Sequence, residues 1–122
     1  EHGGATSLVH TPRALMSRAQ SRPAHSRAKI EEAFGCKVFD KYGSREFSGI
    51  AYECDAHAGH HVVSEGYIVE ILVDGRPALP GETGELVITD LNNYAMPFLR
   101  YRIGDLAVAM ADEPCACGRG AP

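Results

Sequence analysis

Hydrophobic residues early in the chain follow the period of a helix. In the segment 26–35, Ile30, Ala33 and Phe34 stand at positions i, i+3 and i+4, which share one face of an α-helix. Gly35 follows directly and is a common residue just past the end of a helix. The pattern therefore predicts one short helix with an apolar face.

The pattern then changes to that of strands and turns. The segment 37–40 contains good strand formers and predicts a short strand. The triplet 42–44 (Tyr-Gly-Ser) predicts a loop directly after it, a position where α/β proteins often hold ligands. Further along, the segment 67–73 is apolar and β-branched, and Asp74-Gly75 is a strong hairpin signal.

The second half of the chain continues this β pattern. The segment 80–84 predicts a turn, and residues 85–89 alternate as expected for a strand. A turn is expected at Gly104-Asp105, followed by a last strand over 106–110. We therefore expect an α+β fold, in which a short helix precedes a small, mostly antiparallel sheet or distorted β-barrel.

Size and composition limit the possible classes of protein. The 122 residues are 44% hydrophobic, which suits one domain with a modest core. The formal charge of −4 argues against a nucleic-acid partner. No apolar run approaches the roughly 20 residues that cross a bilayer, and no secretory signal is recognisable, so we expect no membrane partner.

The first 24 residues differ in composition from the rest. No acidic residue occurs between Glu1 and Glu31, whereas basic and Ser residues are frequent. This composition can mark an organellar transit peptide, or a solvated segment cut from a larger protein. We expect residues 1–24 to be disordered and residues 25–122 to form the domain. The basic residues are Arg13, Arg18, Arg22, Arg27 and Lys29.

The four cysteines suggest a metal rather than disulfides. One residue separates Cys115 from Cys117, which is poor spacing for a mutual disulfide and natural for a shared metal. This cysteine usage predicts a reducing, cytoplasmic compartment. Cys36, in the helix-to-strand connection, is interpreted as a core residue. Cys54 could equally be a small buried hydrophobe, and Cys115 and Cys117 could simply occupy a turn.

Two short motifs carry the strongest functional signal. The segments 42–46 (YGSRE) and 100–105 (RYRIGD) are separated by a β-rich stretch that ends in 89–91 (TDL). In this order they resemble signature motifs of the adenylate-forming superfamily, in particular the branch of phenylacetate–CoA ligases and their capsule-biosynthesis relatives. The resemblance covers about residues 30–119.

The resemblance implies a role for each residue of the first motif. Tyr42 would pack against adenine, and Gly43 would let the backbone approach the ligand. Ser44 would lie near the α-phosphate and the carboxylate of the substrate, and Glu46 would help to hold Mg²⁺. The superfamily pattern has threonine where this chain has Arg45, so Ser44 could supply the hydroxyl.

The second motif would contribute the ribose contact. In the family the aspartate that corresponds to Asp105 binds the ribose hydroxyls, because a carboxylate can accept hydrogen bonds from both. We also assign Arg102 to the nucleotide site. Either Arg100 or Arg102 could instead pair with an acid such as Glu85 as structural support.

Some members of the resembled family carry a zinc cluster, and its residues are present here. Cys54, His61, Cys115 and Cys117 would fill a closed tetrahedral shell, which is typical of structural zinc. His61 aligns best with the family's histidine, while His57 and His60 remain alternatives.

The resemblance predicts the parent reaction. A small carboxylic acid would attack the α-phosphate of ATP to give acyl-AMP, and coenzyme A would then give the thioester. Family members are several times longer and carry an upstream phosphate loop and a C-terminal catalytic lysine that this sequence does not contain. We therefore expect a fragment that is inactive by itself, with the remainder of the enzyme as a partner. The alternatives are a zinc-stabilised binding module without catalysis and a degenerate gene product.

Overall fold

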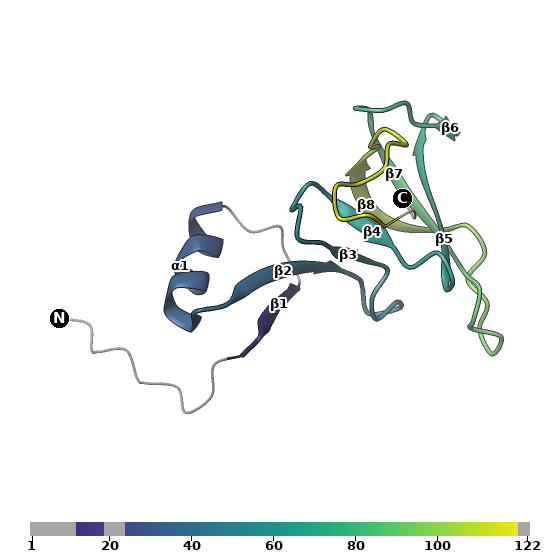
Figure 1. Ribbon diagram of the computed structural model, residues 1–122. Coiled ribbons are helices and arrows are strands. Elements are labelled where there is room, and N and C mark those ends of the chain that lie inside the picture. The colour runs from purple at the N-terminus through teal and green to yellow at the C-terminus, as the bar shows by residue number, and fades with distance from the viewer. Residues whose placement is uncertain (1–11, 19–23, 120–122) are drawn as a thin grey trace.

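The computed structural model describes residues 12–18 and 24–119, which form one helix and two four-stranded sheets (Figure 1). The first sheet has the strand order β1-β2-β3-β4 and the second has the order β6-β5-β7-β8. The fold is thus α+β, as predicted, with two small sheets in place of one. The elements are β1 (Ala14–Arg18), α1 (Ala24–Phe34), β2 (Lys37–Tyr42), β3 (Ala51–Glu53), β4 (His60–Val62), β5 (Tyr67–Val73), β6 (Arg76–Pro77), β7 (Thr83–Asp90) and β8 (Tyr101–Val108).

The first sheet begins with a strand that the sequence did not predict. β1 pairs in parallel with β2, with Leu15 opposite Val38, and the other strand pairs of both sheets are antiparallel. The segment 14–18 lacks β-branched residues, so its conformation depends on pairing with β2 rather than on local propensity. The expectation of disorder is therefore wrong for these five residues. Residues 1–11 and 19–23 lie outside the described residues, and the domain boundary at residue 24 stays a prediction.

The predicted helix is confirmed, but its apolar face is not buried. α1 ends as expected, because Gly35 adopts a φ of 65° and its N–H donates to the carbonyl of Glu31 at 2.8 Å. Ala33 is exposed and Phe34 is 38% exposed. α1 contacts the sheet through β2 and lies at the end of the molecule remote from the second sheet (Figure 1). No helix among the described residues has the length and apolarity needed to cross a membrane.

The hairpin at Asp74-Gly75 is confirmed. Asp74 has a φ of 50° and Gly75 a φ of 82°, so both turn residues adopt the left-handed conformation that a tight two-residue hairpin requires. They connect β5 to β6, and Val73 pairs with Arg76 across the turn.

The predicted turn at Gly104-Asp105 is wrong. β8 runs without interruption from residue 101 to residue 108, and residues 103–105 stand opposite Leu86 of β7 alone, which makes a bulge. Gly104 has a φ of 88°, which a residue with a side chain rarely adopts. The bulge matters because it sets the direction of Asp105 at the edge of the second sheet.

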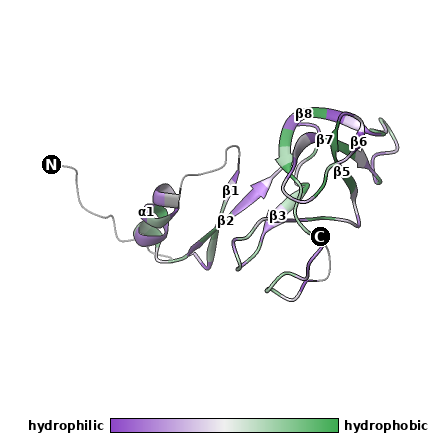
Figure 2. Cartoon of the chain, turned by 90° about the horizontal axis from the view of Figure 1, so that it is seen from above, coloured by the Kyte–Doolittle hydropathy of each residue, from purple (hydrophilic) through white to green (hydrophobic). Residues whose placement is uncertain are grey.

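The hydrophobic core lies between the second sheet and the loop that connects β2 to β3. Phe47 and Ile50 from this loop pack against Leu86 and Ile88 of β7, and each of the four is at most 5% exposed. Hydrophobic residues are prominent on β5 and β8 in Figure 2. The hydrophobic contacts of this loop therefore hold the first sheet against the second.

Candidate nucleotide and metal sites

The two signature motifs meet in the structure. The Tyr42 hydroxyl donates a hydrogen bond of 2.6 Å to the Asp105 carboxylate, although 63 positions separate the two residues. Tyr42 is the last residue of β2 and Asp105 lies in the bulge of β8. Burial raises the pKa of the Tyr42 hydroxyl, and the hydrogen bond and charge of Asp105 raise it further. An aromatic ring and a carboxylate, one from each motif, thus lie side by side, and their contact with a nucleotide stays a prediction.

The loop after Tyr42 is closed by backbone hydrogen bonds and needs a glycine. The Ile50 N–H donates to the Tyr42 carbonyl at 2.9 Å, and the Ser44 N–H donates to the Phe47 carbonyl at 2.9 Å. A Cβ atom on Gly43 would lie 2.9 Å from the carbonyl oxygen of Ser48, closer than real Cβ atoms approach. Gly43 therefore allows the loop to fold back on itself.

Ser44 and Glu46 form a polar pair on the exposed side of this loop. The Ser44 hydroxyl donates to the Glu46 carboxylate at 2.6 Å. This hydrogen bond, together with a backbone N–H, lowers the pKa of Glu46, so the carboxylate is negatively charged at neutral pH. A charged, exposed carboxylate beside a hydroxyl is a suitable ligand pair for a hard cation such as Mg²⁺.

The structure does not bring Arg102 to Tyr42 and Asp105. The side chains of Tyr101 and Ile103 pack against the core, so Arg102 between them points to the opposite face of β8. There its Nε lies 3.2 Å from a carboxylate oxygen of Glu85, which is the structural pairing that the sequence left open. The assignment of Arg102 to the nucleotide stays an untested prediction.

Arg100 also pairs with a carboxylate of the second sheet. Its Nε and Nη2 each donate to Glu70 at 3.0 Å. Both arginines of the second motif therefore have carboxylate partners from β5 or β7, which leaves Asp105 as the residue of that motif that faces the first.

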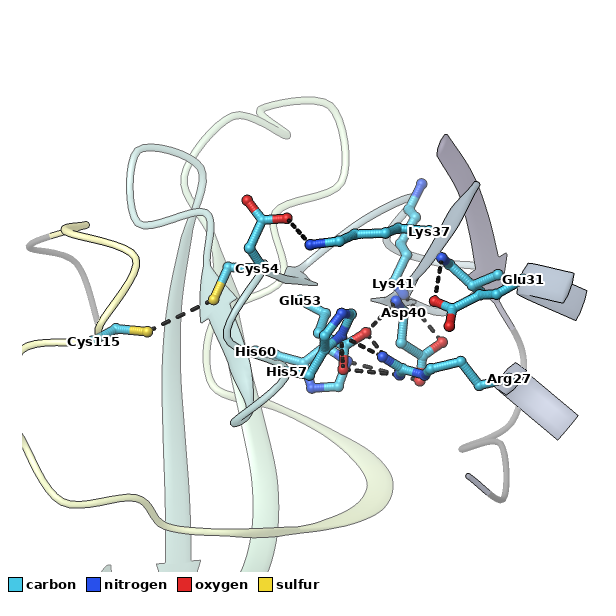
Figure 3. Close-up of polar contacts among 12 residues, drawn as sticks. Arg27, Glu31, Lys37, Asp40, Lys41, Glu53, Cys54, His57, His60 and Cys115 are labelled. Carbon is cyan, nitrogen blue, oxygen red and sulfur yellow. Dashed lines mark hydrogen bonds and ion pairs between the residues drawn. The ribbon is translucent and has the colours of Figure 1, made fainter. Parts of the chain in front are cut away.

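The cysteine–histidine cluster is formed by Cys54, His61, Cys115 and Cys117. One ligand atom from each residue lies within 4.8 Å of all the others. The Sγ atoms of Cys54 and Cys115 are 3.7 Å apart (Figure 3), and the Sγ of Cys117 is 3.4 Å from Nε2 of His61. Tetrahedral zinc with bonds of about 2.3 Å to sulfur and about 2.0 Å to nitrogen would separate its ligand atoms by roughly 3.5–3.8 Å. The donor set and spacing fit a closed zinc shell.

Strand pairing decides which histidine joins the cluster. His60 pairs with Glu53 across β3 and β4, and His61, as the next residue of the strand, points to the opposite face. On the His60 side, Nδ1 of His57 lies 3.1 Å from Glu53, and Nε2 of His60 lies 3.9 Å from Asp40. His61 is therefore the member of the trio that the structure brings to the cysteines.

The cysteine environment also suits metal binding. All four cysteines of the chain are free thiols. The backbone N–H of Arg119 lowers the pKa of Cys117, which favours the thiolate that a metal requires. For Cys115, a backbone hydrogen bond that lowers the pKa is outweighed by burial and by hydrogen bonds to the neighbouring thiols, so the pKa of Cys115 is raised. The Gly118 N–H donates to the Cys115 carbonyl at 3.0 Å and closes a tight turn that presents both thiols on one side. Cys36 lies outside the cluster and is half-buried rather than a core residue.

A charged network around Glu53 was not predicted from the sequence. Nη2 of Arg27 donates to both oxygens of this carboxylate at 2.9 Å, and the Asp40 N–H donates to it at 2.8 Å (Figure 3). Arg27 also contacts His57, and the Glu53 side chain is only 8% exposed. The network anchors α1 to the first sheet. Its partners are far apart in sequence, so no local motif could have indicated it.

Comparisons with known proteins agree with the motifs. No protein-family model matches the chain. Over 98 residues the chain is 36% identical to the phenylacetate-coenzyme A ligase of Thermus thermophilus, a match that covers 76% of this chain and 22% of that protein. It is 38% identical over 85 residues to the phenylacetate-coenzyme A ligase of Escherichia coli, covering 66% of this chain and 20% of that protein.

A solved structure shares the fold. The chain superposes on an open conformation of 2-hydroxyisobutyryl-CoA ligase, solved in complex with 2-HIB-AMP and CoA, with a TM-score of 0.78. The sequences are 24% identical, and the match covers 90% of this chain and 25% of that ligase.

The two sheets thus share the fold of a segment of this CoA ligase. More closely, the chain is homologous to part of the phenylacetate-coenzyme A ligases, and it spans about a fifth of the length of the curated relatives that it matches.

Proposed function

We propose that this chain supplies the adenosine-contacting part of an ATP-dependent carboxylate–CoA ligase that forms acyl-AMP and then acyl-CoA. The observation that carries the proposal is the hydrogen bond of 2.6 Å between Tyr42 and Asp105, which joins the two motifs expected at opposite sides of the nucleotide. The relatives named as phenylacetate-coenzyme A ligases support the reaction class. A phenylacetate-like acid is the corresponding substrate.

Each residue then has a defined task. The Tyr42 ring packs against adenine, and the Asp105 carboxylate accepts hydrogen bonds from the ribose hydroxyls. The Ser44 hydroxyl lies toward the α-phosphate, and the charged Glu46 helps to hold Mg²⁺. The attack of a carboxylate on the α-phosphate depends on orientation and charge neutralisation, which is what these groups would provide.

The cysteine–histidine cluster is proposed to hold a structural zinc ion. Four protein ligands complete a tetrahedral shell and leave no position for a catalytic water. A zinc-stabilised module without nucleotide affinity is the second candidate function, and the spacing of the four ligand atoms within 4.8 Å supports it independently of the motifs.

Nucleotide binding separates the two candidates. Titration of the zinc-loaded chain with a non-hydrolysable acyl-adenylate and Mg²⁺ should show saturable binding. Asp105→Ala should weaken this binding about ten- to hundredfold, because hydrogen bonds to a charged group contribute about 1.5–3 kcal/mol. The matched control is Asp112→Ala, at an exposed position beyond β8. Equal affinities of the two variants would remove Asp105 from the ribose role, and no binding by the parent chain would favour the zinc-stabilised module.

Metal content tests the zinc site separately. Cys117→Ser should lower the zinc stoichiometry, measured by elemental analysis. It should also lower the midpoint of thermal unfolding by roughly 8 °C or more. Each kcal/mol lost from the free energy of unfolding shifts this midpoint by about 4–8 °C in a domain of this size. Cys36→Ser, which alters a thiol outside the cluster, should change neither quantity. A Cys117→Ser chain with the parent's stability and zinc content would contradict the assignment.

A further inference from the structure

The cysteine–histidine cluster links the two sheets beside their covalent connection, since His61 stands one residue before β4 ends and the chain crosses to β5. The chain crosses from the first sheet to the second between β4 and β5. Cys54 and His61 belong to the β3–β4 side, whereas Cys115 and Cys117 follow β8 of the second sheet. Figure 1 shows the yellow C-terminal segment running back beside β4. A metal held by all four residues would therefore link the two sheets.

Each half of the cluster is close to one half of the nucleotide site. On the first sheet, Tyr42 pairs with Ala51 in β3, and Cys54 directly follows this short strand. On the second sheet, the segment that follows β8 is fixed by two backbone hydrogen bonds, from the Ala109 N–H to Glu82 at 2.9 Å and from the Gly81 N–H to Ala109 at 2.8 Å. These bonds fix the start of the segment that carries both cysteines to the second sheet. Strand β8 of the same sheet carries the Asp105 bulge.

Few other contacts fix the spacing between the sheets. The strands of one sheet make little direct contact with the strands of the other. Apart from the cluster, the described links include the core around Phe47 and Ile50, against which Tyr42 also packs, and the hydrogen bond of 2.6 Å between Tyr42 and Asp105. The core can act as a pivot, because the loop that carries Phe47 packs into the second sheet. The hydrogen bond between the Tyr42 hydroxyl and the Asp105 carboxylate lies at the exposed edge of this core, and one such bond is too weak to hold the spacing alone.

We propose that metal occupancy of the cysteine–histidine cluster sets the spacing between Tyr42 and Asp105, so that its four ligands are positioning residues for the nucleotide. The consequence for nucleotide affinity rests on the proposed function, whereas the consequence for the Tyr42–Asp105 contact does not. Loss of the metal frees the sheets to move about the core, and the aromatic and carboxylate sides of the site then separate.

The first test observes this contact without any nucleotide. Tyrosine labelled with carbon-13 at Cζ reports the hydrogen bonding of each phenol by NMR, and Tyr42→Phe assigns the resonance of Tyr42. Removal of zinc by a chelator should shift the Tyr42 resonance, while Tyr67 and Tyr101, whose rings contact Phe47 in the core, keep theirs. An unchanged Tyr42 resonance in the zinc-free chain would overturn the proposal. Global unfolding on zinc removal would overturn it too, because the metal would then stabilise the whole chain.

The second test uses matched variants and acyl-adenylate affinity. His61→Ala should bind the adenylate at least tenfold more weakly, whereas His61→Cys, which offers a fourth thiolate to zinc, should keep the parent's affinity. His60→Ala, next in sequence but on the opposite face, is the control and should also keep it. Equal affinity of the zinc-loaded and zinc-free chains would overturn the positioning role. If the zinc-loaded chain binds no adenylate, the proposed function fails, and the Tyr42 resonance alone decides the role of the metal.

Discussion

Glu53 is a charged residue in a nearly closed environment, and its partners determine how it titrates. Burial alone would raise the pKa of Glu53, but hydrogen bonds from Arg27, from the Asp40 N–H and from His57 outweigh burial and hold the pKa below its usual value. Since the pKa is lower in the folded than in the unfolded chain, ionised Glu53 stabilises the fold at every pH above the unfolded value. This contribution is lost as the pH falls through the folded value.

Glu53→Gln should therefore destabilise the chain in a pH-dependent way. At pH 7 we expect a loss of about 1–3 kcal/mol in the free energy of unfolding, because Arg27 loses a charged acceptor in a partly buried position. The difference from the parent should shrink below about pH 4.3, the usual glutamate pKa. Urea unfolding between pH 3 and pH 7 measures both effects. Glu32→Gln, on the exposed side of α1, should show neither, and a constant difference across this range would contradict the mechanism.

At the scale of the elements, those with local signals were predictable. Gly35 marks the end of α1, and Asp74-Gly75 forces the hairpin of β5 and β6, since each of these residues supplies the backbone conformation that the position needs. The bounds of β5 also match the predicted segment 67–73, an apolar run that Glu70 alone interrupts. Such signals depend on a few adjacent residues, so they can be recognised without knowledge of the rest of the fold.

The elements that the sequence missed depend on distant partners. β1 forms because β2 offers a parallel edge, and the bulge of β8 exists only in relation to β7. Gly104 indicated an unusual backbone conformation but could not distinguish a turn from a bulge. For the same reason, the sequence identified the apolar face of α1 but not that it is largely exposed, because periodicity does not show what covers a face.

The candidate sites divide in the same way. The structure brings the two motifs together at Tyr42 and Asp105, while their shared role in a nucleotide site stays a prediction. The choice of His61 among three histidines depended on the register of β3 and β4. The pairing of Arg102 with Glu85 was one of two open alternatives, and the alternation of β8 decides its direction. Sequence order thus indicated which segments converge, whereas register decided which side chains do.

At the scale of the whole molecule, stability depends on one aromatic cluster between two small sheets. Neither sheet buries much by itself, and the Phe47 ring makes edge-to-face contacts with Tyr67, Phe98 and Tyr101 at centroid distances of 5.8, 5.1 and 6.0 Å. Phe47 is 1% exposed and comes from the loop that carries the first motif. Folding of the loop that connects β2 to β3 and packing of the second sheet are therefore coupled.

Phe47→Ala should weaken both sheets together. Truncation of a fully buried phenylalanine costs about 3–5 kcal/mol through lost burial and the cavity that remains. Because Phe47 connects the loop to the second sheet, unfolding followed by tyrosine fluorescence and by circular dichroism should shift to lower denaturant by the same amount. Phe34→Ala, at a position on α1 that is 38% exposed, should cost less than about 1 kcal/mol. If Phe47→Ala shifted only one of the two signals, the two sheets would unfold independently. The core could then not be the point about which the sheets are proposed to move when the metal is lost.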